Sequence, residues 1–162
     1  MTTSGQLPIS LKDTAERALK EIFSKQLKLS LEPAESSDET HDFKTFHASV
    51  SITGDRVKAS VLLQISEAFA AKATKILIGC EGQGEEIEDA TGELCNMISG
   101  RIKSELTAAG FPGVLGTPII TVGSRIDLRG ATGSDLCRTE WTCGTDRINL
   151  QILIQPCPFQ KY

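Results

Sequence analysis

Apolar residues recur with a period of about 3.6 residues in three segments of the chain and of about two residues in six others. This pattern predicts three helices and six strands. The helices are expected over residues 9–26, 66–79 and about 85–109. The strands are expected over residues 27–32, 43–52, 56–65, 117–123, 137–143 and 147–155. Gly54-Asp55 and Gly144 stand between consecutive strands, so each predicts the turn of a hairpin.

Local signals mark the ends of the helices. Ser66 is well placed to cap the second one, and Gly110 followed by Phe111-Pro112 ends the third. The order helix, strand, strand, strand occurs twice with a linking helix between, and the two halves are offset by about 76 residues. We therefore expect an α+β fold in one domain, residues 1–162. Its six-stranded antiparallel or mixed sheet would be covered by two long helices and one shorter helix.

Composition narrows the classes of function. The net charge of −4, with scattered basic residues, argues against nucleic acid as a partner. Five cysteines without a Cys-x-x-Cys pair, and only two histidines, signal neither a disulfide framework nor a metal site. No segment has the pattern of a signal peptide or the length of a membrane span, so we expect a cytoplasmic protein without membrane insertion.

The helix over residues 85–109 carries an unusual polar stripe. Its apolar side chains fall on one broad face that would pack on the sheet. The stripe lies beside that face and is expected to be exposed; it consists of Asp89, Glu93, Asn96 and Gly100, with Lys103 nearby. Glycine in a helix costs about 1 kcal/mol relative to alanine. Gly100 therefore indicates that a partner approaches the helix closely.

A purely structural interpretation of the same residues is also open. Glu93 and Asn96 would then be ordinary solvated positions on the helix. Gly92 and Gly100 would allow tight packing against another helix. The pattern of residues alone does not decide between the two interpretations.

The segment "DATGELCNMISGRIKSEL" resembles the signature of the CheC–CheX–FliY family of chemotaxis phosphatases. In that signature an acidic or serine residue is followed by Glu four positions later and Asn seven positions later, and a Gly follows. These positions are Asp89, Glu93, Asn96 and Gly100, and Pro118 matches a proline that opens a strand further on. The resemblance extends over about residues 43–123 and is greatest to the CheX branch.

The resemblance implies a phosphatase acting on the aspartyl phosphate of a CheY-type response regulator. Asn96 would hold a water molecule in line with phosphorus, and Glu93 would pair with the active-site lysine of the regulator. Asp89, Gly100 and Lys103 would contribute to partner binding. The Mg²⁺ ion would belong to the partner, so no metal or cofactor of the protein's own is expected. The CheX branch commonly forms homodimers through the sheet.

Two other functions stay open. The same fold could bind a receiver domain without hydrolysing its phosphate, or could serve as a structural subunit like relatives in the flagellar switch. If the halves repeat, Arg17 and Lys20 occupy the positions of Glu93 and Asn96, so a second active site is not expected.

Other candidate groups carry less weight. Residues 79–86, "GCEGQGEE", are expected to be a connection and not a phosphate loop. Cys95 is expected to pack near the core, and His41 and His47 have no evident partner. Trp141 and the last strand are expected in the sheet core, with pairing of that strand to another chain as an alternative.

Overall fold

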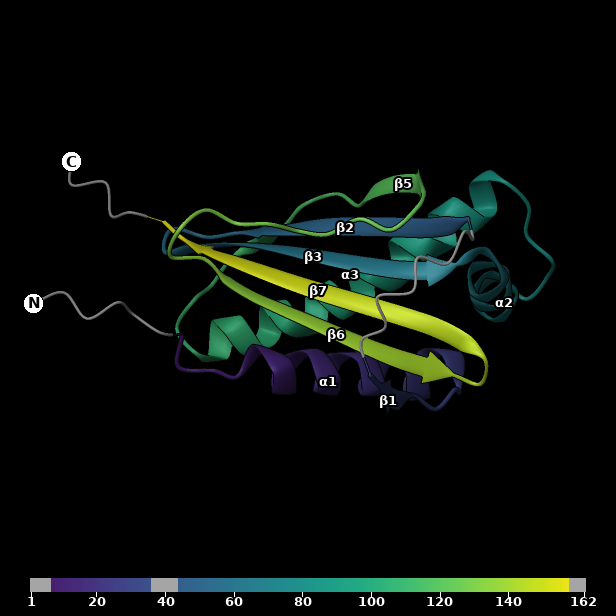
Figure 1. The fold of residues 1–162 in the computed structure, drawn as a ribbon, viewed down its shortest axis with the longest axis horizontal. Coiled ribbons are helices and arrows are strands. Elements are labelled where there is room, and N and C mark those ends of the chain that lie inside the picture. Colours follow the sequence, from purple (N-terminus) through teal and green to yellow (C-terminus); the bar gives the residue numbers. More distant parts are fainter. Residues whose placement is uncertain (1–6, 36–43, 158–162) are drawn as a thin grey trace, which may run out of the picture.

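The computed structural model describes residues 7–35 and 44–157, which form three helices and one antiparallel sheet of seven strands (Figure 1). The helices are α1 (Leu11–Ile22), which continues as a π-helical segment (Phe23–Leu27), α2 (Glu67–Ile78) and α3 (Glu85–Ala108). The strands are β1 (Glu32–Ala34), β2 (Thr45–Thr53), β3 (Val57–Ser66), β4 (Val114–Leu115), β5 (Ile119–Gly123), β6 (Asp135–Cys143) and β7 (Asp146–Pro156).

The strand order is β1-β6-β7-β3-β2, and both β4 and β5 pair with the outer edge of β2. The strands β1, β2 and β3 of the first half correspond to β5, β6 and β7 of the second half. When corresponding strands are exchanged, the same order is obtained, read from the opposite edge of the sheet. The predicted repeat is therefore present in the topology. The two-residue strand β4 is additional to the six strands expected.

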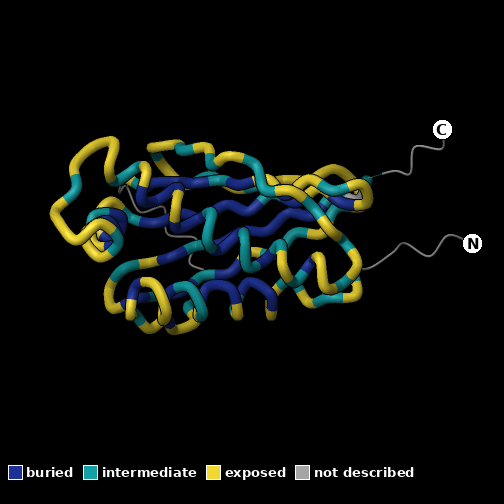
Figure 2. The backbone as a smooth tube through the Cα atoms, turned by 180° about the vertical axis from the view of Figure 1, so that it is seen from behind, coloured by how far each residue is buried: buried dark blue, intermediate teal, exposed yellow. Residues whose placement is uncertain are grey.

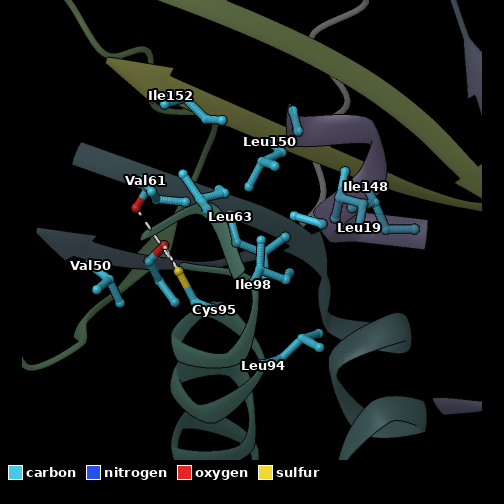
Figure 3. Close-up of a cluster of buried hydrophobic side chains, with 14 of the residues drawn as sticks. Leu19, Val50, Val61, Leu63, Leu94, Cys95, Ile98, Ile148, Leu150 and Ile152 are labelled. Atoms are coloured by element: carbon cyan, nitrogen blue, oxygen red, sulfur yellow. Dashed lines mark hydrogen bonds between the residues drawn. The ribbon is translucent and has the colours of Figure 1, made fainter. Parts of the chain in front are cut away.

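Helices α1 and α3 pack together on one face of the sheet, with α3 behind the central strands in the view of Figure 1, and α2 lies at the right-hand end of the strands. The core lies between α3 and the inward-facing positions of the three central strands (Figure 3). Its central side chains include Val50, Val61, Leu63, Leu94, Ile98, Leu150 and Ile152, each at most 1 % exposed. Burial of one such Leu, Ile or Val side chain contributes about 1.5–3 kcal/mol, so this layer fixes α3 on the sheet.

The opposite face of the sheet is partly covered by the connection between β5 and β6, residues 124–134. The side-chain oxygen of Gln64 accepts a hydrogen bond from the Ile126 amide at 2.9 Å. The side-chain oxygen of Gln151 accepts one from the Leu128 amide at 2.8 Å. Both glutamines are buried, and a buried amide without partners is costly. The two side chains therefore hold this connection against the sheet.

Most predicted boundaries agree with the structure. The Ser66 hydroxyl accepts a hydrogen bond from the Phe69 amide at 3.1 Å, which confirms the cap of α2. The third helix was expected to end at Gly110, and that residue has a φ of 90°, which suits glycine. Both hairpins, and the connection over residues 79–84, lie where the sequence predicts them.

One prediction was wrong. Of residues 27–32, where a strand was expected, Leu27 ends the π-helical segment, residues 28–31 belong to no helix or strand, and β1 begins only at Glu32. The last strand, β7, lies in the sheet core between β6 and β3 as expected, and the alternative of an edge strand does not apply. Trp141, at 4 % exposed, lies in the core as expected. His41 lies outside the described residues.

Candidate functional site

The polar stripe lies on the solvent side of α3. Asp89 and Glu93 are exposed, and the other three residues, Asn96, Gly100 and Lys103, are half-buried. At 3.6 residues per turn, the five residues of the stripe lie in one angular sector of the helix. Together with the buried Gly92, which lies at its edge, this sector is about 100° wide. Figure 2 shows the general pattern, in which the helices alternate between buried inner positions and exposed outer positions within single turns.

The functional groups of Glu93 and Asn96 are unengaged. Within the described part of the chain, neither side chain takes part in a hydrogen bond or an ion pair. The two residues are three positions apart, so their side chains neighbour each other one turn apart on the helix surface. A carboxylate and an amide are thus both free to bind groups of another molecule.

Gly92 fixes the position of the stripe relative to the sheet. A Cβ atom at this residue would lie 3.2 Å from Cδ1 of Ile120 and 3.4 Å from Cβ of Pro118. The missing side chain therefore allows the segment that opens β5 to pack directly on α3, one residue before Glu93. This glycine serves packing, but against the β4–β5 segment and not against another helix.

Gly100 has a different environment. A Cβ atom there would meet only Cδ1 of Leu115, at 3.9 Å, which is an ordinary van der Waals contact. Packing within the chain therefore does not require glycine at this position. Gly100 leaves a shallow, half-buried surface beside Asn96.

The other long flank of α3 packs on α1 through paired charges. Nη2 of Arg17 donates to Oε2 of Glu105 at 2.8 Å, and the Thr14 hydroxyl donates to the same carboxylate at 2.7 Å. The hydrogen bond from Arg17 holds the pKa of the Glu105 carboxyl below its ordinary value. Arg101 forms a second ion pair across the helices, with Glu21. Because these charges satisfy one another, this flank offers few free groups to a partner.

The repeat does not duplicate the stripe. Arg17 and Lys20 of α1 stand where Glu93 and Asn96 stand in α3. Arg17 is bound to Glu105, and Nζ of Lys20 lies 2.7 Å from Oε1 of Glu16. The Glu and Asn pair is therefore found on α3 and not at the equivalent positions of α1.

Cys95 is a core residue and not a nucleophile. Its side chain is fully buried, and Sγ donates to the carbonyl of Ala48 at 3.2 Å (Figure 3). Burial raises the pKa of the Cys95 thiol to about 12. The reactive thiolate would be scarce near neutral pH.

His47 is buried in β2 with no hydrogen-bond partner for either ring nitrogen among the described residues. Burial lowers the pKa of its imidazole. Residues 7–35 and 44–157 hold no cluster of three or more His, Cys, Asp or Glu side chains that could bind a metal ion. In the same part of the chain, no helix has both the length and the apolar composition needed to cross a bilayer.

Sequence reasoning missed the residues that flank the stripe on the sheet side, namely Leu115, Ile120 and Val122. The alternation in "TPIITVG" does place Ile120 and Val122 on one face of a strand. It does not reveal that this strand lies at the edge of the sheet, next to α3.

Comparison with known proteins identifies the family. The model of the family described as chemotaxis phosphatase CheX matches residues 46–140. Among solved structures, CheX from Vibrio vulnificus is 18 % identical with a TM-score of 0.75, and the match covers 96 % of this chain and 100 % of that one. CheX from Desulfovibrio desulfuricans is 20 % identical with a TM-score of 0.74, and the match covers 91 % and 100 %.

A third similar structure is the complex of CheX with CheY, BeF3 and Mg²⁺ from Borrelia burgdorferi. It is 17 % identical with a TM-score of 0.67, and the match covers 91 % of this chain and 99 % of that one. At these identities the solved structures establish the fold. No curated protein sequence matches the chain.

Proposed function

Since the chain belongs to the CheX family of chemotaxis phosphatases, we propose that it hydrolyses the aspartyl phosphate of a CheY-type receiver domain. The observation that carries this proposal is the pair of unengaged groups, the Glu93 carboxylate and the Asn96 amide, one turn apart on the outer side of α3. The similar CheX structure from Borrelia burgdorferi, which was crystallised with CheY, supports the choice of partner.

In this proposal, Asn96 enters the active site of the receiver domain and positions the attacking water through its side-chain amide. The water oxygen forms a bond to phosphorus while the bond between phosphorus and the aspartyl oxygen breaks. The receiver regains its carboxylate, and the protons of the water leave with inorganic phosphate or pass to solvent. Most of the acceleration comes from orientation of the water, because misplacement by 1 Å can cost about a hundredfold in rate.

Glu93 pairs with the active-site lysine of the receiver and fixes the register of Asn96 on the phosphoryl group. A charge-assisted hydrogen bond of this kind is about twice as strong as a neutral one. Asp89 and Lys103 add charge at the two ends of the contact, and Gly100 lets the partner approach the helix backbone. The Mg²⁺ ion is supplied by the receiver and stabilises charge on the phosphoryl oxygens.

The proposal extends to assembly and location. The protein works in the cytoplasm, where receiver domains are found, and it forms a homodimer through its sheet. Sedimentation equilibrium over a range of protein concentrations measures the mass in solution. A monomer at all concentrations would overturn the dimer and leave the phosphatase proposal unaffected.

The phosphatase itself is tested by the loss of phosphate from a panel of phosphorylated receiver domains, with this protein at catalytic amounts. We expect faster loss with at least one receiver. Lys12→Ala serves as a control, because Lys12 is exposed on α1 and lies outside α3 and its stripe. Stoichiometric binding to phosphorylated receivers without any faster loss of phosphate would contradict the enzyme and favour a receiver-binding module.

A further inference from the structure

A row of apolar side chains runs beside the stripe on the sheet side of α3. It consists of Leu115, Pro118, Ile120 and Val122, and we refer to it as the apolar row. The first three residues are half-buried, and Val122 is 40 % exposed. Ile120 and Val122 face the helix layer, because they pair with Ala48 and Phe46, which are core residues.

The row follows α3 in the reverse direction. Leu115 lies nearest to Gly100, whereas Pro118 and Ile120 lie nearest to Gly92. Val122 comes two strand residues later, about 6.6 Å further on, which corresponds to about four residues of helix. The row therefore accompanies the stripe from Gly100 past Gly92, and Val122 extends it towards the end of the stripe that contains Asp89.

A partner that covers the stripe must also cover one of its flanks. A specific interface buries about 800 Å² on each partner, with roughly 20–30 residues a side, and a stripe of five residues is far smaller than that. On the α1 side, Arg101 and Glu105 are already paired with other charges, and contact there would cost their desolvation. On the sheet side the flank is apolar, which is the composition of the buried part of an interface.

We propose that the apolar row is the second part of the docking surface for the receiver domain, with Val122 as its most exposed contact. This inference rests on the proposed function. It assigns to the receiver an apolar patch beside its phosphorylation site, next to the lysine that pairs with Glu93. The stripe then positions the attacking water and aligns α3 with the phosphoryl group, and the apolar row provides much of the affinity for the receiver.

The test compares two lysine substitutions on one strand. Val122→Lys places a charge in the apolar row. Ile119→Lys is the matched control, because Ile119 is 66 % exposed and pairs with Ser49, a position on the opposite face of the sheet. Lysine is well tolerated on edge strands, so both variants are expected to fold, as checked by circular dichroism. Val122→Ser is a milder second variant in case Val122→Lys does not fold.

Phosphate loss is measured with wild type and variants at varied concentrations of a phosphorylated receiver. For Val122→Lys we expect KM to rise about tenfold or more while kcat changes less than about twofold, which is the signature of lost docking. For Ile119→Lys we expect both constants to stay within about twofold of wild type. Affinity for the same receiver loaded with beryllofluoride should fall in parallel with the rise in KM.

Three outcomes would overturn the inference in different ways. An active wild type with unchanged KM in Val122→Lys and Val122→Ser would show that the row does not contact the receiver. Equal losses of affinity for the receiver in the Val122 and Ile119 variants would indicate a general effect of lysine on strand β5. A variant with unchanged KM and altered mass in sedimentation would assign the row to a second copy of the chain. An inactive, non-binding wild type would instead contradict the proposed function itself.

Discussion

Two neighbouring residues of α3 illustrate how little the sequence neighbourhood says about the role of a side chain. Glu93 is exposed and unengaged, whereas Leu94, the next residue, is fully buried in the core. Because the chain gains its stability from Leu94 and its neighbours, substitution of Glu93 should change binding with little effect on folding. Asn96 and its neighbour Cys95 differ in the same way, because Asn96 is only half-buried whereas Cys95 is fully buried in the core.

The role of the Glu93 charge can be tested with Glu93→Gln. This change keeps the shape of the side chain and removes its charge, so affinity for the phosphorylated receiver should fall about tenfold, and the remaining binding should depend less on salt. Titration at two ionic strengths measures both effects. Asp55→Asn, which removes one exposed charge in the β2–β3 turn, should leave affinity unchanged. Equal effects of the two substitutions would point to net charge and not to a specific pair.

His47 predicts a pH dependence of stability. Burial lowers the pKa of the His47 imidazole in the folded state. At pH values below the ordinary histidine pKa of about 6.5, the unfolded chain therefore binds more protons at this residue than the folded chain does. The free energy of unfolding should therefore fall as pH decreases from 7 towards 5, by at most about 1.4 kcal/mol per pH unit from this group.

His47→Leu should remove that slope. The substitution costs no hydrogen bond to the described residues, because neither ring nitrogen has a partner there. Urea denaturation of wild type and variant at several pH values is the measurement. A variant that keeps the full wild-type slope between pH 5 and 7 would assign the dependence to other groups.

At the scale of elements, the two glycines of α3 have opposite expected effects on stability. Gly100→Ala should raise the free energy of unfolding by about 0.5–1 kcal/mol, because alanine is the better helix former and the new methyl group meets no close neighbour. Gly92→Ala gains the same propensity but must displace Ile120 or Pro118. We expect it to be less stable than Gly100→Ala by about 1–3 kcal/mol.

Denaturant unfolding of the two variants checks this difference. Equal stabilities would mean that the β4–β5 segment does not pack on α3 as the structure shows. Activity offers a second comparison, since Gly100→Ala should weaken docking of the receiver despite its greater stability.

Local sequence patterns were sufficient to predict most helices and strands. They failed where contacts between residues far apart in sequence determine the structure. The bounds of α3 and both hairpins follow from periodicity, caps and turn residues that act within a few positions. The strand expected over residues 27–32 was wrong, because the alternating residues Leu27 and Leu31 reach the core from a helical segment and from the residue before β1. Which strand neighbours α3 depends on contacts far apart in sequence.

The whole molecule is a symmetric sheet that carries its site on one side only. The two halves contribute equivalent strands, and α1 and α3 pack together over one face. The stripe with Glu93 and Asn96 belongs to α3. At the equivalent positions of α1, Arg17 pairs with Glu105 of α3 and Lys20 pairs with Glu16 within α1. The candidate site could be identified from the motif on α3, whereas its apolar flank became apparent only from the packing of β4 and β5.

Loss of phosphate from phosphorylated receiver domains, compared between wild type and Asn96→Ala, tests the central claim most directly. Alanine removes the amide that positions water and leaves Glu93 in place. We therefore predict that the variant binds the receiver with nearly wild-type affinity and has lost its acceleration of phosphate loss. An Asn96→Ala variant that still accelerates phosphate loss as well as wild type would contradict the account.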